Sequence, residues 1–339
     1  MGTLNPSADT VQANRLVGSS SLVGLALVLI IGLAAYWLST LHESLEALAV
    51  ALLLGMVVRG VIGDQMRLRP GIQLASKIFI PLGIILYGVR LDIPRLGGLA
   101  LPVLAHTLVN MALFYLIVLG LHRWWPLRRA TSVLLASGSA VCGASAIVVL
   151  SPLADAESED TSVSLIVVTS IGLLGAMLYP ALKLIFNWSD QFYAVLAGST
   201  LHQTATVRLA VAGLAQEVVN YALTVKMVRV VMLIPLSFLV AWLGRRQDRS
   251  GRSTLRQVWF VFAFAAVGLL VSFTPLRSYQ SSLAPWSTLA LGTAMASIGL
   301  SMNLGSVIDA GLRPLIIGVV AWLAVLMMFI LSATVLPIG

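Results

Sequence analysis

Two basic residues lie three positions apart inside a long apolar segment of the chain. Lys226 and Arg229 occur in the stretch TVKMVRVV, and this spacing places them on one face of a helix. A charge near the middle of a bilayer costs at least about 2.5 to 3.5 kcal/mol, so it normally faces a cavity, a partner or a substrate. No acidic residue falls deep in an apolar segment. The pair therefore favours an anionic ligand, and snorkelling towards the membrane surface is the structural alternative.

Two segments rich in glycine, serine and threonine interrupt apolar stretches. They are GSAVCGASAI at residues 138–147 and GSTLHQTATV at residues 198–207. A helix that breaks inside a membrane leaves backbone N–H groups and a partial positive charge for an oxyanion, whereas close helix packing is the alternative. We expect the substrate to be bound by Gly138, Ser139, Cys142, Gly143, Ser145, Ser199, Thr200, His202, Gln203, Thr204, Lys226 and Arg229.

The remaining polar residues inside apolar segments have weaker interpretations. His202 binds substrate or carries a proton, because the unperturbed pKa of histidine is about 6.5. His106 is expected to form an interhelical hydrogen bond. Lys77 is expected to snorkel, and Arg208 either lines the site or caps a half-helix. The sequence shows no metal-ligand cluster, nucleotide motif or catalytic constellation, so we expect no cofactor, no metal and no enzyme activity.

The composition is that of an integral membrane protein. Of 339 residues, 59% are apolar and 10% charged, with a mean hydropathy of +0.97, whereas soluble domains are about 25% charged. Residues 1–18 form a polar tail, and 19–339 form one transmembrane domain. A span needs roughly 20 apolar residues. We expect an all-α fold of about eleven transmembrane helices at 19–40, 45–62, 72–89, 97–120, 130–152, 161–183, 189–213 (broken), 217–243, 257–273, 286–303 and 314–337.

The basic residues between these spans predict the orientation. With the N-terminus inside, only Arg90, Arg95 and Arg277 fall outside, which indicates an N-in, C-out protein. Arg128 then lies inside and the acidic run at residues 155–160 lies outside. The net charge of +8 reflects this topology and not nucleic-acid binding. The expected partners are a small anionic substrate and membrane lipid.

Two internal similarities suggest repeats. LYGVRLDI at residues 86–93 aligns with SIGLSMNL at 297–304, in helices of opposite direction. LLASGSAVCGASA also aligns with AVLAGSTLHQTATV, although eleven spans give both segments the same direction. Either residues 186–197 re-enter the membrane, or the second similarity is compositional. Inverted repeats are typical of secondary transporters, which bind substrate between them near the bilayer midplane.

Several stretches together resemble the YeiH-like family of proposed sulfate exporters in the bacterial inner membrane. They are ALLLGMVVRG, PLGIILYGVRLDI, GSAVCGASAI, LHQTATVRLAVAG, VKMVRVVMLIPL and AMASIGLSMNLG. The resemblance implies the wider sodium/proton antiporter and bile acid symporter superfamily, with a core of crossing broken helices. It also implies a second panel of helices that mediates protomer contacts, and so a homodimer. The ion-binding aspartates of that superfamily are absent.

The residues and the resemblance together predict a secondary transporter in the bacterial inner membrane. It moves a small anion, a sulfur oxyanion or a sulfonate, by alternating access. An anion channel with the same residues and a sodium-coupled carrier of carboxylates or other organic anions are the alternatives.

Overall fold

The computed structural model describes residues 19–41, 45, 47–63, 67–90, 94, 97–245, 254–301 and 311–335. The predicted tail at residues 1–18 lies outside this set. All regular secondary structure in the described part is helical, and seven segments are long and apolar enough to cross a membrane. They are Ser21–Leu41, Arg69–Arg90, Leu101–Trp124, Ser158–Phe186, Gln216–Trp242, Pro275–Ser301 and Arg313–Ala333. The all-helical membrane fold is confirmed, whereas the number and direction of crossings stay predictions.

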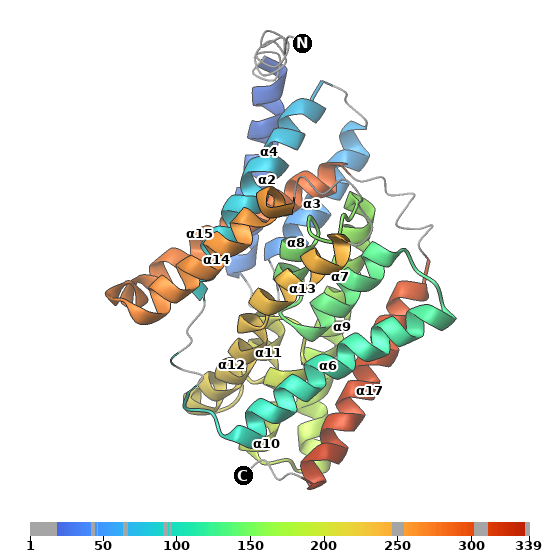
Figure 1. Ribbon diagram of the computed structural model, residues 1–339, viewed down its shortest axis with the longest axis vertical. Helices are drawn as coiled ribbons and strands as arrows, with labels where there is room; N and C mark the ends of the chain where they lie inside the picture. The colour runs from blue at the N-terminus through green and yellow to red at the C-terminus, as the bar shows by residue number, and fades with distance from the viewer. Residues whose placement is uncertain are drawn as a thin grey trace, which may run out of the picture.

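The first of two helix bundles combines the first helices of the chain with helices from residues 254–301 (Figure 1). It contains α2 (Ser19–Leu41), α3 (Ala47–Ile62), α4 (Arg69–Tyr87), α14 (Thr254–Phe273) and α15 (Gln280–Ser301), with a short helix η1 (Gly88–Arg90) after α4. Small residues allow α15 to pack closely: a Cβ on Gly55 would lie 2.6 Å from the Ala296 carbonyl. The hydroxyls of Ser76 and Ser297 join α4 to α15 at 2.7 Å. This bundle is therefore tightly packed around α15.

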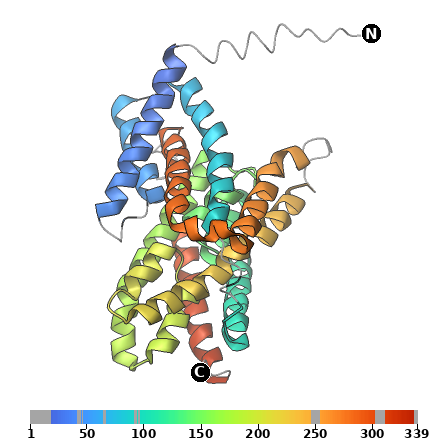
Figure 2. The same cartoon turned by 90° about the vertical axis from the view of Figure 1, so that its left-hand side faces the viewer.

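The second bundle surrounds α9 (Ser158–Phe186). Its other helices are α6 (Leu101–Trp124), α7 (Arg129–Ala140), α8 (Ala144–Leu150), α10 (Asp190–Thr200), α11 (Thr204–Ala210), α12 (Gln216–Val231), α13 (Leu233–Arg245) and α17 (Arg313–Val335). The Trp322 ring of α17 stacks on Tyr179 of α9 at 6.0 Å. His106 of α6 is 3.0 Å from the Ser332 hydroxyl of α17, which confirms the expected interhelical bond. Figure 2 shows this bundle beside and below the first.

Both predicted broken segments fold back on themselves. The N–H of Gly143 donates to the Gly138 carbonyl at 2.9 Å, and a Cβ on Gly138 would lie 2.8 Å from Ile147 Cδ1. Nine residues of straight helix would separate Gly138 from Ile147 by about 13 Å. In the second segment the hydroxyl of Tyr193 donates to the Ala210 carbonyl at 2.8 Å, although seventeen residues separate them. Helices α7–α8 and α10–α11 therefore form two helical hairpins.

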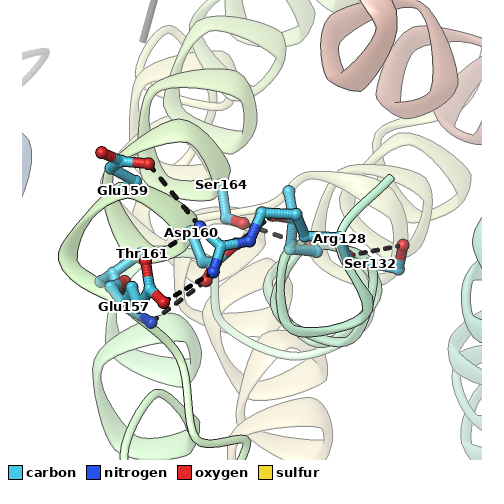
Figure 3. A network of polar contacts seen from close by, with 8 residues as sticks. Arg128, Ser132, Glu157, Glu159, Asp160, Thr161 and Ser164 are labelled. Carbon is cyan, nitrogen blue, oxygen red and sulfur yellow. Dashed lines mark hydrogen bonds and ion pairs between the residues drawn. The ribbon is translucent and has the colours of Figure 1, made fainter. Parts of the chain in front are cut away.

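The open ends of the two hairpins, where the chain enters and leaves them, lie at opposite ends of α9. At its N-terminal end Arg128 pairs with Glu157 at 2.8 Å (Figure 3). Thr131 donates to Asp160 at 2.6 Å in the same region of α9. At its C-terminal end Lys183 pairs with Asp190 at 2.9 Å. Near its middle Gln203, at the tip of α10–α11, donates to Thr169 at 2.9 Å. In Figure 1, α7 and α8 accordingly lie higher than α10 and α11.

This arrangement corrects one topology prediction. Residues 130–152 were expected to cross the membrane once, placing Arg128 and residues 155–160 on opposite sides. The ion pairs of Arg128 with Glu157 and Glu159 place them at the same end of α9. The apolar run is long enough for a span, but its break lets the chain return. The second segment also folds back as a hairpin, which agrees with the alternative in which residues 186–197 re-enter the membrane. Residues 91–93 and 302–304 of the other internal similarity lie outside the described residues.

Candidate functional site

The tips of the two hairpins meet where glycine is required. Gly143, between α7 and α8, has φ 71° and ψ −123°, a conformation that residues with a Cβ rarely adopt. A Cβ there would also lie 3.2 Å from the His202 carbonyl and would overlap the Gln203 side chain. At the other tip Gln203 precedes α11, and its N–H donates to the Thr206 hydroxyl at 3.2 Å. The two predicted breaks are thus in direct contact.

Lys226 and Arg229 of α12 lie beside these tips, and we call them the carbonyl clamp. Both side chains are 0% exposed. Lys226 donates to the carbonyls of Leu201 and His202 at 2.6 and 2.7 Å. Arg229 donates to carbonyls of both hairpins: Ala140 at 2.7 Å, Leu201 at 2.7 Å, Ser199 at 2.8 Å and Ser139. The clamp thus holds the C-terminal ends of α7 and α10, where helix dipoles favour a cation.

A cavity of about 330 Å³ lies between the two bundles at the hairpin tips. The first bundle contributes Ser39, Leu45, Ala47, Leu48, Tyr87, Arg90, Thr288 and Leu291. The second contributes Cys142, Ser145, Gln203, Thr204, Ala205, Arg208 and Leu223. Four of the predicted substrate residues therefore share one wall. Lys226 and Arg229 are not among the described lining residues.

Two arginines line this cavity, and none of its described lining residues is acidic. Arg90 is held by its own bundle: it donates to Ser287 at 3.3 Å, to Thr288 at 2.5 Å and to the Ala284 carbonyl at 3.3 Å, and it lies 5.6 Å from the Tyr87 ring. Arg208 is exposed, and no described residue pairs with it. The cavity therefore contains one oriented and one unpaired guanidinium.

Several predicted residues lie at the tips but away from the cavity. The hydroxyls of Ser199 and Thr200 donate within α10 to the carbonyls of Val195 and Leu196, at 2.6 and 2.5 Å. Gly138 and Gly143 provide close packing and the turn, as described above. Ser139 is buried, and its carbonyl accepts from Arg229. These residues build the hairpin tips without lining the space between the bundles.

Buried polar atoms at the tips lack partners among the described residues. They are both ring nitrogens of His202, the Ser139 hydroxyl and the Gln203 side-chain oxygen. The His202 ring packs edge-on against Phe114 at 5.6 Å. Because the two clamp cations are close by, a positive charge on His202 would be repelled. The described residues contain no group of His, Cys, Asp and Glu that could hold a metal ion.

Sequence reasoning missed part of the cavity wall. Tyr87 carried no signal, and Arg90 was interpreted only as a loop residue that reports orientation. For Arg208 the sequence allows either a lining or a capping role, and the structure places it in the lining of the cavity. The pairing of Arg90 with α15 joins residues almost 200 positions apart, so local sequence could not show it.

The fold and site define an all-helical, multi-pass integral membrane protein with a cationic cavity between two bundles. The chain belongs to the family described as conserved hypothetical protein 698, which matches residues 23–318. It is similar to the UPF0324 membrane proteins of Archaeoglobus fulgidus, with 33% identity over 90% of both chains, and of Pseudomonas aeruginosa, with 34% identity over 90% of this chain and 89% of the relative. A Bacillus cereus relative is 30% identical, covering 88% and 89%. The YeiH-like resemblance is confirmed. No solved structure matches significantly.

Proposed function

We propose that this protein is a secondary transporter that moves small anions by alternating access between its two bundles. One observation carries the proposal: the cavity at the hairpin tips contains Arg90 and Arg208 and no acid among its described lining residues. Secondary transporters bind substrate between the structural units that move against each other, and this cavity lies between the two bundles. Because no described residue pairs with Arg208, we propose an anionic substrate as its partner.

The charge in this region supports the same ligand class. With both clamp side chains protonated, their formal charge is +2, and the C-terminal ends of α7 and α10 each offer roughly half a negative charge. About one positive charge remains uncompensated within the hairpin tips, close to Cys142 and Gln203 of the cavity wall. An anion in the cavity would complete the balance. The clamp would then act on the substrate through the electrostatic field, because its donors are used by carbonyl groups.

The two walls of the cavity belong to different bundles, which supports alternating access. A displacement of the second bundle against the first would open the cavity to one side and then to the other. The hairpins approach from opposite ends of α9, as expected for an inverted pair. Replacing two of the eleven predicted crossings by hairpins leaves an odd number, so the proposed N-in, C-out orientation is kept. The bacterial inner membrane and a homodimer complete the proposal.

The test is anion counterflow in proteoliposomes, with sulfate, sulfite, thiosulfate, taurine and acetate as substrates. We expect uptake that is stimulated by the same anion inside and is at least about tenfold weaker in Arg208→Gln. Arg208→Lys should recover part of it. Arg313→Gln is the matched control, because Arg313 is an exposed arginine outside the cavity lining.

Other outcomes separate the alternatives. Anion flux without counterflow would indicate a channel, and uptake that requires an imposed sodium gradient would indicate a sodium-coupled carrier. Equal uptake by wild type and Arg208→Gln would contradict the assigned site. A wild type that moves none of these anions would contradict the function.

A further inference from the structure

We infer that the transported anion is organic, with a small apolar body beside its charged group, because four aliphatic side chains line the first-bundle wall of the cavity and the unpaired Arg208 lines the other wall. The preferred class is short alkyl sulfonates or carboxylates over inorganic oxyanions. The inference rests on the proposed function and specifies its substrate.

The two walls differ in chemistry. The second bundle presents hydrogen-bonding groups around the unpaired Arg208, namely Ser145, Gln203 and Thr204. The first bundle presents the aliphatic side chains Leu45, Ala47, Leu48 and Leu291, together with the polar groups of Ser39, Tyr87, Arg90 and Thr288. Its one cation, Arg90, already donates to three groups of α15. The anionic group is therefore best placed on the hairpin wall, with the apolar part of the ligand against α3 and α15.

The size of the cavity agrees with a ligand larger than an inorganic oxyanion. The space of about 330 Å³ is at the lower end of the roughly 300 to 1,000 Å³ typical of small-molecule sites. One water occupies about 30 Å³ of the liquid, so an anion of a few heavy atoms would leave room for several waters. Those waters would lie against Leu48 and Leu291, where water is less favourable than an alkyl group.

Gln203 gives a second, independent indication of a ligand. Its side chain is 2% exposed and lines the cavity, yet its oxygen has no partner among the described residues. Its nitrogen is 2.9 Å from the Thr169 hydroxyl, which can donate or accept. The amide can therefore present either its oxygen or its NH₂ group to a ligand. The NH₂ group would suit a sulfonate or carboxylate oxygen beside Arg208.

The experiment compares methane-, ethane-, propane- and butanesulfonate with sulfate, as competitors of tracer uptake and as stabilisers of the purified protein against heat. Each added methylene should improve apparent affinity about threefold to fourfold until the cavity is filled. Leu45→Ala and Leu48→Ala, which shorten two side chains of the aliphatic wall, should flatten this series, and the use of two positions guards against loss of folding in one of them. Leu53→Ala is the matched control, because Leu53 is on α3 but is 48% exposed and outside the cavity lining.

The two measurements separate the inference from the function on which it rests. If sulfate competes as well as butanesulfonate and chain length has no effect, the inference is wrong while anion transport stands. If the sulfonates stabilise the protein progressively but none is transported, the ligand class stands and the transport proposal is wrong. A series that Leu45→Ala and Leu48→Ala both leave as steep as in wild type would also overturn the assigned apolar wall.

Discussion

The two pairs of basic residues near the hairpin tips differ in what their donors contact. Lys226 and Arg229 are fully buried, and their donors reach carbonyl groups of α7, α10 and the adjoining tip. Arg90 and Arg208 line the cavity, where Arg208 has no partner among the described residues. The first pair thus stabilises the broken helices, and in the second pair Arg90 is held by α15 whereas Arg208 is available to an anion. A buried cation in a membrane protein therefore indicates a ligand only after its neighbouring carbonyls have been accounted for.

The largest expected effect comes from Arg229→Ala. It removes the donor to carbonyls in both hairpins, and each buried carbonyl left unpaired costs about 1 to 3 kcal/mol. We expect a large fall in the thermal midpoint of the detergent-solubilised protein, together with loss of transport. Arg208→Ala should leave the midpoint unchanged. An Arg229→Ala protein with wild-type stability and no transport would reverse the roles assigned to the two pairs.

A smaller effect is expected at the contact between the tips. Gly143→Ala forces a side chain into φ 71° and against Gln203, and backbone strain of this kind costs about 1 to 3 kcal/mol. Thermal unfolding should show this loss. Gly213→Ala is the matched control, because no other atom lies within 4 Å of a Cβ placed there. Equal stability of the two variants would mean that the tips are not tightly joined.

His202→Leu tests whether the unpartnered imidazole has a role beyond packing. The ring nitrogens have no partner among the described residues, so an apolar side chain of similar volume should change stability by less than about 1.5 kcal/mol. Because the clamp repels a positive charge at this position, we expect the pH profile of transport to be unchanged. A pH dependence of transport that is present in wild type and lost in His202→Leu would establish proton coupling at this residue.

The smallest effect is expected at the base of the α7–α8 hairpin, far from both pairs. The Arg128 guanidinium lowers the pKa of the Glu157 carboxyl, mainly through a hydrogen bond. A lowered pKa contributes stability that is present above the unfolded pKa of about 4.3 and is lost as pH falls through the folded value. The thermal midpoint of wild type should therefore decrease slightly more than that of Glu157→Gln below about pH 4. Parallel decreases would show that this exposed pair contributes nothing.

Much of the architecture was predictable from composition and local pattern. Apolar runs predicted helices, and the glycine and serine segments predicted breaks where Gly143 and Gln203 now meet. The direction of the chain after each break was not predictable. A run such as residues 130–152 has the same hydropathy whether it crosses or returns, and only the contact of Arg128 with Glu157 distinguishes the two.

The site was predictable in its parts but not in its assembly. The spacing of Lys226 and Arg229 indicated a buried cationic face. Their carbonyl partners depend on tertiary contacts spanning 24 to 90 residues, which a single sequence does not reveal. The place of Arg90 in the cavity wall was not predictable for the same reason, because its side chain is oriented by contacts with α15.

The carbonyl clamp also constrains the order in which the chain can be assembled during synthesis. The Ala140 carbonyl accepts a hydrogen bond from Arg229, which is synthesised 89 positions later. The His202 carbonyl of the second tip accepts one from Lys226 of the same helix, synthesised 24 positions later. Until α12 enters the membrane, both hairpin tips expose unpaired backbone groups to lipid or to the insertion machinery. Insertion of α12 is therefore the step that pairs the carbonyl groups of both hairpin tips, and truncation before residue 226 should leave them unpaired.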